Sequence, residues 1–336
     1  MRIAILTPTF SYYSGIDRVV ELQAQEYAKK GDKVTVFALE ATLKPKVFKL
    51  EVLGMPKNLF LQRIYRLLFF LDIKKIKNAT EKLKEYNMVI SHFYPMNWIA
   101  YYAKKRYAIK YIYYNHGIGY SELFENVFDK IYLKLFAFLN RLSLKNVDSA
   151  ISISKFMQSE LKKETGLNSK VIYNKIDKKR FRRGINGSKI RKMLGIKNNE
   201  KLMLFVGRLS PHKNVHTLLK IIDNVNEKMP NAKLLIIGKP TFPNYYKKIK
   251  KLANKNVIFK EFVDDKELPY YYAACDLYVT ASLWEGFNLT IAEAQACGKK
   301  VVAFDVCSHP EVVKNGVLIK PNNIDEFANA IIRLLK

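Results

Sequence analysis

The sequence predicts an α/β fold made of two Rossmann-like domains, each built on a parallel sheet. The chain has 336 residues, which suits two domains of about 150 residues each. Short apolar runs alternate with longer helical stretches in both halves, a pattern typical of parallel sheets covered by helices on both faces. Hydrophobic residues make up 49% of the chain and charged residues 26%, so each half can bury a core.

The first half begins with a strand, a helix and a second strand. We expect the strand at 3–7, a loop through Gly15, a helix over 17–30 that Gly31 ends, and the second strand at 34–38. Apolar runs predict further strands at 88–91, 111–114 and 149–153, the last of which closes the set. Long helical stretches are predicted at 60–85 and 123–144.

The second half repeats this alternation. Strands are predicted at 202–206, 233–237, 257–259, 277–280 and 300–304, and helices at 215–225, 245–253, 268–274, 289–297 and 324–335. The stretch 174–197 is polar, basic and dotted with glycine, so we expect the domain boundary there, with domains at 1–175 and 176–336. Ligands of such sheets bind at the carboxyl ends of the strands, so the predicted active site is the cleft between the domains.

The segment 284–294 joins a predicted strand to a predicted helix and carries two glutamates. Asn288 is the predicted N-cap, and the amide groups after it, with the positive end of the helix dipole, favour an anion. Gly286 lets a ligand approach the backbone closely. Glu285 and Glu293 are expected to face one cleft and to accept hydrogen bonds from sugar hydroxyls. The alternative is a loop charge and a solvated helix residue.

A second strand-to-helix loop, 206–214, reads Val-Gly-Arg-Leu-Ser-Pro-His-Lys-Asn, with Asn214 as the predicted N-cap. Arg208 can bind phosphate oxygens with two N–H groups, and Lys213 adds a point charge just before the helix. Together they would neutralise a diphosphate leaving group. The alternative is that two of the 58 basic residues of the chain fall in this loop by chance.

These two segments resemble the signature of the GT-B glycosyltransferases of family 4, a large retaining group. That family carries two glutamates separated by seven residues, as Glu285 and Glu293 are, and a Gly-Arg-Leu strand end followed by a lysine, as in 207–213. The resemblance implies a GT-B fold, with the parallel sheets of two Rossmann-like domains facing across a cleft. Weaker matches extend it over nearly the whole sequence, at 152–154, 171–174 and 310–313.

The resemblance also implies a role for each matching residue. Arg208 and Lys213 bind the diphosphate of a nucleoside-diphosphate sugar, and Glu293 holds the ribose hydroxyls. Glu285 holds the donor sugar together with backbone amides of the next segment, at Phe287, Asn288 and Leu289. In this sequence Asn288 stands where the family often has glycine, and 307–309 (Cys-Ser-His) where it often has paired glycines.

The resemblance adds two candidates in the first half. His116 follows the predicted strand 111–114 and corresponds to a family histidine that lines the catalytic cleft near the donor sugar. The alternative for His116 is a histidine in a surface loop. Gly15 resembles the glycine-rich loop that approaches the donor phosphates and the acceptor, and Ser14 occupies the place of the usual second glycine.

The expected chemistry needs no metal and no cofactor. The sequence contains no Asp-x-Asp motif, which bridges a metal ion and the diphosphate in the other large glycosyltransferase fold. Arg208, Lys213 and helix dipoles would therefore stabilise the leaving diphosphate. The resemblance implies retention of anomeric configuration. Since no residue is an obvious carboxylate nucleophile, we expect the acceptor to attack on the face that the diphosphate leaves, with the departing phosphate taking the proton.

The net charge of +28 suits an anionic membrane, a nucleic acid or a phosphorylated substrate, and a merely lysine-rich composition is the alternative. Segments 59–84 and 133–144 combine apolar, aromatic and basic residues, as do helices that lie on an anionic bilayer. The alternative is that they cover the core of the first domain. If they bind a membrane, the acceptor is expected to be a lipid-linked or cell-surface glycan precursor.

The expected compartment is the cytoplasm. Residues 1–10 are expected to form a strand and not a signal peptide, and no stretch reaches the roughly 18 apolar residues of a transmembrane helix. Cys275, Cys297 and Cys307 match no zinc spacing and are expected to be reduced. Two alternatives stay open: another GT-B nucleotide-sugar enzyme such as an epimerase, and a non-catalytic basic protein that binds membrane or nucleic acid. We expect no nucleic-acid partner, because no such motif is present.

Overall fold

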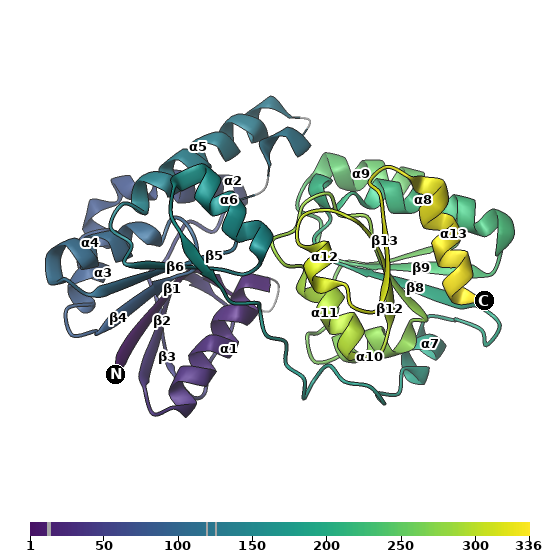
Figure 1. The fold of residues 1–336 in the computed structure, drawn as a ribbon, viewed down its shortest axis with the longest axis horizontal. Coiled ribbons are helices and arrows are strands. Elements are labelled where there is room, and N and C mark those ends of the chain that lie inside the picture. The colour runs from purple at the N-terminus through teal and green to yellow at the C-terminus, as the bar shows by residue number, and fades with distance from the viewer. Residues whose placement is uncertain (12–14, 119, 125) are drawn as a thin grey trace. The chain divides into compact units, whose positions relative to one another are not determined.

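The computed structural model describes residues 1–336 except for 12–14, 119 and 125. The chain divides into two compact units, Met1–Lys175 and Ile176–Lys336. Each unit holds one sheet in which every strand pairs in parallel. We describe the two units separately as unit 1 and unit 2 (Figure 1).

The sheet of unit 1 has seven strands in the order β3-β2-β1-β4-β5-β6-β7. Its strands are β1 (Arg2–Phe10), β2 (Lys33–Ala41), β3 (Lys49–Val52), β4 (Met88–Ser91), β5 (Lys110–Asn115), β6 (Ser149–Ser152) and β7 (Ser169–Val171). Its helices are α1 (Gly15–Lys29), α2 (Leu59–Leu67), α3 (Ile73–Lys82), α4 (Asn97–Tyr107), α5 (Val127–Ser143) and α6 (Lys155–Thr165), with short 3₁₀ turns at Phe69–Leu71 and Ser121–Leu123.

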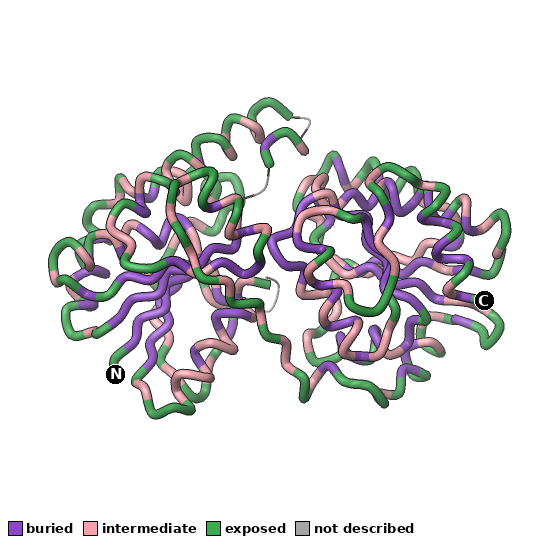
Figure 2. Tube along the Cα trace, in the orientation of Figure 1, coloured by how far each residue is buried: buried purple, intermediate pink, exposed green. Residues whose placement is uncertain are grey.

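The inner strands of unit 1 are apolar on both faces because helices cover both (Figures 1 and 2). On one face, Ala4 and Leu6 of β1 belong to a core cluster with Ile76 of α3 and Ile99 of α4. The intervening side chain of Ile5 points to the other face, which α1 covers, and is fully buried. This double burial explains why β1 reads as a continuous apolar run and not as an alternating one.

The prediction of one long helix over 60–85 was wrong, because Asp72 interrupts it. The Oδ1 atom of Asp72 accepts a hydrogen bond from the backbone N–H of Lys75 at 3.1 Å and so starts a new helix, α3. The expectation that 149–153 closes the sheet was also wrong. The edge strands β3 and β7 have only four and three residues, too few to show a strand period.

Unit 2 has a six-stranded sheet in the order β10-β9-β8-β11-β12-β13. Its strands are β8 (Lys201–Val206), β9 (Ala232–Ile237), β10 (Val257–Lys260), β11 (Leu277–Thr280), β12 (Lys300–Phe304) and β13 (Gly316–Ile319). Its helices are α7 (Ser188–Met193), α8 (Val215–Lys228), α9 (Pro243–Leu252), α10 (Leu268–Ala274), α11 (Leu289–Ala296), α12 (His309–Val312) and α13 (Ile324–Leu335), with a 3₁₀ turn at Pro211–Lys213.

The core of unit 2 lies between this sheet and the helices α8, α9 and α13, which cover one face (Figure 1). Phe327 of α13 meets Phe304 of β12 edge to face, with ring centroids 5.2 Å apart. The polar stretch 174–197 carries more structure than its composition suggested. Phe181 is buried against Tyr272, and a Cβ at Gly187 would lie 2.3 Å from the backbone nitrogen of Ala274.

Both sheets reverse their strand order beside the first strand. In unit 1 the reversal lies between β1 and β4, and in unit 2 it lies between β8 and β11. Loops that leave the carboxyl ends of such neighbouring strands diverge and leave room for a ligand. These two switch points are therefore the places to look for functional side chains.

Candidate active site

The switch point of unit 2 brings two sequence-predicted residues into contact. Lys213, after β8, and Glu285, after β11, form an ion pair with 2.6 Å between Nζ and Oε1. Their side chains are only 15% and 9% exposed, so the pair is largely removed from water. Because burial strengthens such a pair and penalises either charge alone, the two residues act as a unit.

Asn288 supports this pair from the side. Its amide nitrogen lies 3.1 Å from Oε1 of Glu285 and 3.0 Å from Nε2 of His309, and its amide oxygen accepts a hydrogen bond from the hydroxyl of Thr290 at 2.7 Å. Asn288 is the N-cap residue of α11, as predicted, and only the expected capping bond from its side chain is absent. Its backbone has φ +64°. A positive φ favours glycine, the residue that the family often has there.

Asn214 shows the same departure. It precedes α8 with φ +53° and makes no side-chain bond to the first turn of backbone amides. Its amide oxygen instead accepts a hydrogen bond from the hydroxyl of Thr217 at 2.7 Å. The loop conformation, and not a side-chain cap, thus sets the start of α8.

Two residues of the segment 307–309 complete the surroundings of Glu285. Ser308 donates its hydroxyl hydrogen to the backbone oxygen of Glu285 at 3.0 Å. Nδ1 of His309 lies 2.7 Å from the backbone oxygen of Phe304, which can only accept, so this nitrogen carries the proton. Burial lowers the pKa of His309, which leaves Nε2 free to accept the hydrogen bond from Asn288. Sequence reasoning noted this segment only as a departure from glycine.

Glu293 lies in α11, apart from the ion pair, and is 3% exposed. It accepts a hydrogen bond from the hydroxyl of Tyr272 at 2.8 Å. The hydroxyl of Tyr278 lies 2.6 Å from that of Thr290, and burial raises the pKa of Tyr278 well above its usual value, with Glu285 and Glu293 both adding to the shift. Neither Tyr272 nor Tyr278 was predicted as a residue of this site.

The remaining predicted residues of unit 2 lie along the same two loops. Phe287 is 8% exposed, and Leu289 is the first residue of α11. Arg208 is exposed beyond the end of β8. Its neighbour Gly207 packs closely, because a Cβ there would lie 3.1 Å from the ring of Phe205 and 3.7 Å from the side chain of Lys213.

Gly238 holds the end of β9 against the end of β8. A Cβ at this position would lie 1.8 Å from the carbonyl oxygen of Gly207, so we expect Gly238→Ala to push the Gly207–Arg208 segment away. The free energy of unfolding of unit 2 should fall by about 1–3 kcal/mol, measured by urea denaturation. Gly195→Ala is the control for lost stability alone: alanine is strained at its φ of +68°, but the open space around it means that no neighbouring segment is pushed away. Its nucleotide affinity should stay at the wild-type value. A nucleotide affinity that falls equally in both variants would contradict this explanation.

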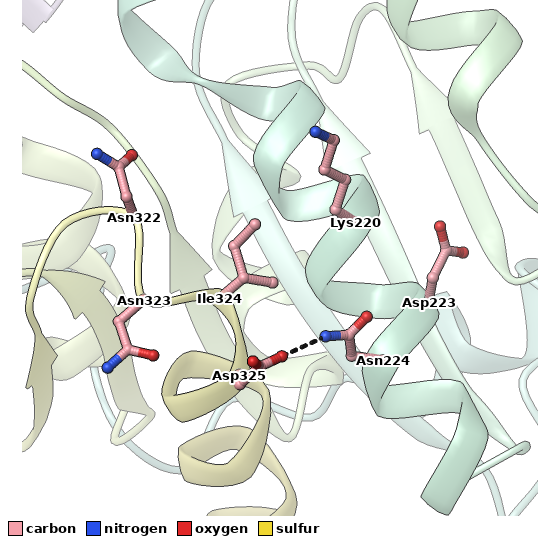
Figure 3. A pocket seen from close by; sticks show the side chains of 7 residues that line it. All are labelled: Lys220, Asp223, Asn224, Asn322, Asn323, Ile324 and Asp325. Atoms are coloured by element: carbon pink, nitrogen blue, oxygen red, sulfur yellow. Dashed lines mark hydrogen bonds between the residues drawn. The ribbon is translucent and has the colours of Figure 1, made fainter.

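A separate hollow of about 510 Å³ in unit 2 lies between α8 and the start of α13 (Figure 3). Its lining includes Lys220, Asp223 and Asp325, with Asn224 donating a hydrogen bond to Asp325 at 2.9 Å. None of the predicted site residues lines it. Its mixed charges give it no preference for an anion, so we do not place the active site there.

The switch point of unit 1 holds a histidine pair. His116, at the end of β5, lies with its Nε2 atom 2.9 Å from Nδ1 of His92, which follows β4. Nε2 of His92 lies 2.8 Å from the amide oxygen of Gln23 in α1, and Tyr114 stacks on the ring of His92. Both histidines are buried, so His116 is not the surface-loop histidine of the alternative interpretation. His92 was not predicted, although it follows a predicted strand just as His116 does.

The hydrogen bonds fix the tautomers of this pair. The amide oxygen of Gln23 can only accept, so Nε2 of His92 carries a proton, Nδ1 of His92 accepts, and Nε2 of His116 donates. Burial lowers the pKa of His116 to about 3 and that of His92 well below its usual value. His116 is thus neutral, with the lone pair on Nδ1.

We expect both imidazoles to stay neutral from pH 7 down to pH about 5. Long-range ¹H–¹⁵N NMR spectra should show the Nε2–H tautomer for both rings. Because the unfolded chain binds protons near pH 6.5 and the folded one does not, the stability that these histidines contribute is lost as the pH falls below 6.5. A His116 ring that titrates near pH 6.5 would contradict the assignment. The substitution His92→Gln removes the imidazole to which His116 donates, so it should broaden the tautomer signal of His116.

The predicted loop at Gly15 lies partly outside the described residues, since Ser14 is not described. Gly15 is the first residue of α1 and is exposed. Asp17, in the first turn, accepts hydrogen bonds from the backbone N–H of Ser11 at 2.8 Å and from the hydroxyl of Thr9 at 3.1 Å. Burial raises the pKa of Asp17 to about 7. Asp17 therefore ties the end of β1 to the start of α1.

Comparison with known families decides the classification of this chain. The model of Glycosyltransferase Family 4 matches residues 13–180, half of the chain. The chain belongs to this family. The model of the glycosyl transferases group 1 matches residues 187–336, so the family assignment extends through both units.

The relatives of this family 4 member include several glycosyltransferases. An uncharacterized glycosyltransferase of Methanocaldococcus jannaschii is 32% identical over 174 residues, 49% of this chain and 44% of the relative. The UDP-Gal:alpha-D-GlcNAc-diphosphoundecaprenol alpha-1,3-galactosyltransferase of Escherichia coli is 30% identical over 202 residues, 57% of this chain and 50% of the relative. The match thus spans about half the length of these curated relatives.

Solved structures show the same fold. The Anabaena protein HepE, crystallised with UDP and glucose, has a TM-score of 0.81 at 23% identity over 100% of this chain and 90% of its own. A sucrose-phosphate synthase from Thermosynechococcus elongatus has a TM-score of 0.80 at 19% identity over the same shares. The prediction of a GT-B fold with two Rossmann-like domains is thereby confirmed.

The residues that the structure describes include neither a metal-binding cluster nor a membrane-spanning helix. Among them, no three His, Cys, Asp or Glu side chains are placed to hold a metal ion. No described helix is both long and apolar enough to cross a bilayer. The three cysteines are free thiols in the structure, two of them buried.

Proposed function

We propose that this family 4 protein is a retaining glycosyltransferase that moves a sugar from a nucleoside-diphosphate sugar to an acceptor hydroxyl. The observation that carries the proposal is the Lys213–Glu285 ion pair at the switch point of unit 2. It combines a cation suited to a diphosphate with a carboxylate suited to sugar hydroxyls. Glu293 of α11 supplies a second carboxylate for the ribose.

The proposed donor is a UDP-sugar, with a GDP-sugar as the other candidate. The support comes from relatives: the Escherichia coli galactosyltransferase is named for UDP-Gal, and HepE was crystallised with UDP. In the proposed complex Arg208 and Lys213 contact the diphosphate. Glu285 and the amides of Phe287, Asn288 and Leu289 hold the donor sugar, and Gly15 lies near the phosphates.

In the proposed reaction the acceptor oxygen attacks the anomeric carbon on the face from which the diphosphate leaves. The new C–O bond forms as the bond from the anomeric carbon to the phosphate oxygen breaks, and that oxygen takes the acceptor proton. Arg208, Lys213 and the N-terminal amides of α11 stabilise the developing negative charge. We propose that this requires neither metal nor cofactor. Neutral His116 would hold the sugar near the reacting carbon.

The proposed acceptor is lipid-linked or a precursor of a cell-surface glycan, and the proposed location is the cytoplasm, with peripheral contact to an anionic membrane. The support is the relative whose name includes a diphosphoundecaprenol acceptor and the net charge of +28. We propose that the protein has no nucleic-acid partner.

The first experiment identifies the nucleotide. A thermal-shift panel of UDP, GDP and ADP, with their sugars, should show stabilisation by one base. The anomer released from that donor in the absence of acceptor, followed by NMR with a chelator present, then tests retention and metal independence. First release of the inverted anomer would refute retention, and activity abolished by the chelator would refute metal independence.

A further inference from the structure

Unit 1 exposes a large apolar surface on two neighbouring helices, α2 and α5. We call it the α2–α5 surface. Its residues are large apolar side chains at least 40% exposed: Leu59, Phe60, Leu61 and Ile64 of α2, and Val127, Phe128, Ile131, Leu135 and Phe138 of α5. Phe128 is 81% exposed, and α2 has no buried residue at all. A contiguous exposed apolar surface of this kind marks an interaction site.

The helical period explains how α5 presents this surface. Phe128, Ile131, Leu135 and Phe138 recur at spacings of three and four, so they share one face of the helix. Phe136, which points elsewhere, is buried and packs on Tyr94 with ring centroids 4.7 Å apart. The inner face of α5 thus packs on the core of unit 1, whereas the apolar side chains on its outer face make no contribution to that core.

One arginine links the two helices. Arg63 of α2 forms an ion pair with Asp129 of α5 at 2.5 Å, and its guanidinium lies 4.8 Å from the ring centroid of Tyr132. This contact neutralises Asp129, an acidic residue on the surface-bearing turn of α5. Lys134 of α5 pairs with the exposed Glu122 at 3.6 Å. Basic residues still outnumber acidic ones on the two helices, because α2 and α5 carry Arg63, Arg66, Lys130, Lys134 and Arg141 against Asp129. The surface therefore combines exposed apolar groups with positive charge.

This combination selects the occupant. A second copy of this chain would also carry a net charge of +28 and would be repelled. A different protein would have to combine an apolar surface with enough negative charge to match this chain. An anionic bilayer accepts the apolar side chains at the headgroup boundary and attracts the cations around them. We propose that the α2–α5 surface docks on an anionic membrane. This rests on the proposed function and names the surface by which a membrane-borne acceptor would be reached.

The position of the surface suits that role. In a parallel sheet a crossover helix starts at the carboxyl edge of the strands, and α5 starts soon after His116, at the end of β5. Gln62 of α2 donates a hydrogen bond to Glu40, near the end of β2, at 3.4 Å. Both helices thus start at the edge of the sheet that carries the histidine pair, and a docked bilayer would present acceptor headgroups beside it.

The test is flotation of the whole protein with vesicles of phosphatidylglycerol and phosphatidylcholine, compared with phosphatidylcholine alone. We expect wild type to float with the anionic vesicles. The variant Phe128→Ser/Ile131→Ser should lose about tenfold or more in membrane partitioning. Phe262→Ser is the matched control, because Phe262 is 58% exposed in unit 2, and it should float like wild type.

Two further readouts separate the outcomes. Circular dichroism on the same samples shows whether a variant is folded, and UDP titration shows whether it still binds nucleotide. These readouts distinguish failure of the membrane-docking proposal from failure of the proposed glycosyltransferase function. Equal flotation of all three proteins would overturn the proposal in favour of diffuse charge attraction, and no flotation of wild type would overturn membrane docking altogether. Sedimentation velocity that shows a wild-type dimer, dissociated by the double substitution without lipid, would instead make the surface a subunit interface.

Discussion

Glu285→Gln should lower the rate of sugar transfer by about a hundredfold or more while UDP still binds. The glutamine keeps the shape and the oxygen that accepts hydrogen bonds from Lys213 and Asn288. Only the negative charge is lost, which frees the charge of Lys213 for the diphosphate and removes the carboxylate that would hold the sugar. Initial rates with the donor identified by the thermal-shift panel measure the effect, and calorimetry measures UDP affinity.

The control for this prediction is Glu227→Gln, an exposed glutamate of α8. It should change neither the rate nor the affinity. A Glu285→Gln protein that transfers sugar at the wild-type rate would remove Glu285 from the proposed catalytic machinery. Loss of UDP affinity with an unchanged turnover number would assign Glu285 to the nucleotide and not to the sugar.

Lys213→Met should destabilise unit 2 by about 2–3 kcal/mol, because it leaves the Glu285 carboxylate, 9% exposed, without its cation. Methionine keeps most of the length and apolar stem of the lysine, so the loss reports charge and not volume. UDP affinity should also fall, since the diphosphate loses a point charge. Urea denaturation and calorimetry measure the two effects.

The double variant Lys213→Met/Glu285→Gln isolates the ion pair. Because it removes both charges, it should recover much of the stability that Lys213→Met loses. UDP affinity should stay low in the double variant, since the cation is still absent. Stability losses that simply add would mean that the pair is not coupled, contrary to the geometry.

The loops of unit 2 were predictable because local sequence determines them. The strand β11 and the helix α10 have the predicted bounds, and the loop glutamate and lysine lie where the motif puts them. The tyrosines Tyr272 and Tyr278 were not predictable, since each sits within an apolar helix or strand that looks like core. Only the tertiary packing shows that their hydroxyls meet Glu293 and Thr290.

Unit 1 was harder for a related physical reason. The break at Asp72 depends on one side-chain hydrogen bond inside a stretch with continuous helical composition. The histidine pair depends on β4 and β5 being neighbours in the sheet, which no local pattern reveals. The available signal was a histidine within two residues of the end of a predicted strand, and it was used for His116 but not for His92.

The central claim is that unit 2 binds a nucleoside diphosphate, with Glu293 holding the ribose and Lys213 contacting the diphosphate. Calorimetric titration of UDP into wild type, Glu293→Ala and the control Glu227→Ala tests it most directly. We predict one saturable site in wild type and in Glu227→Ala, and its loss in Glu293→Ala while the protein stays folded. Absence of nucleoside-diphosphate binding by wild type across UDP, GDP and ADP, or undiminished binding by Glu293→Ala, would contradict the claim.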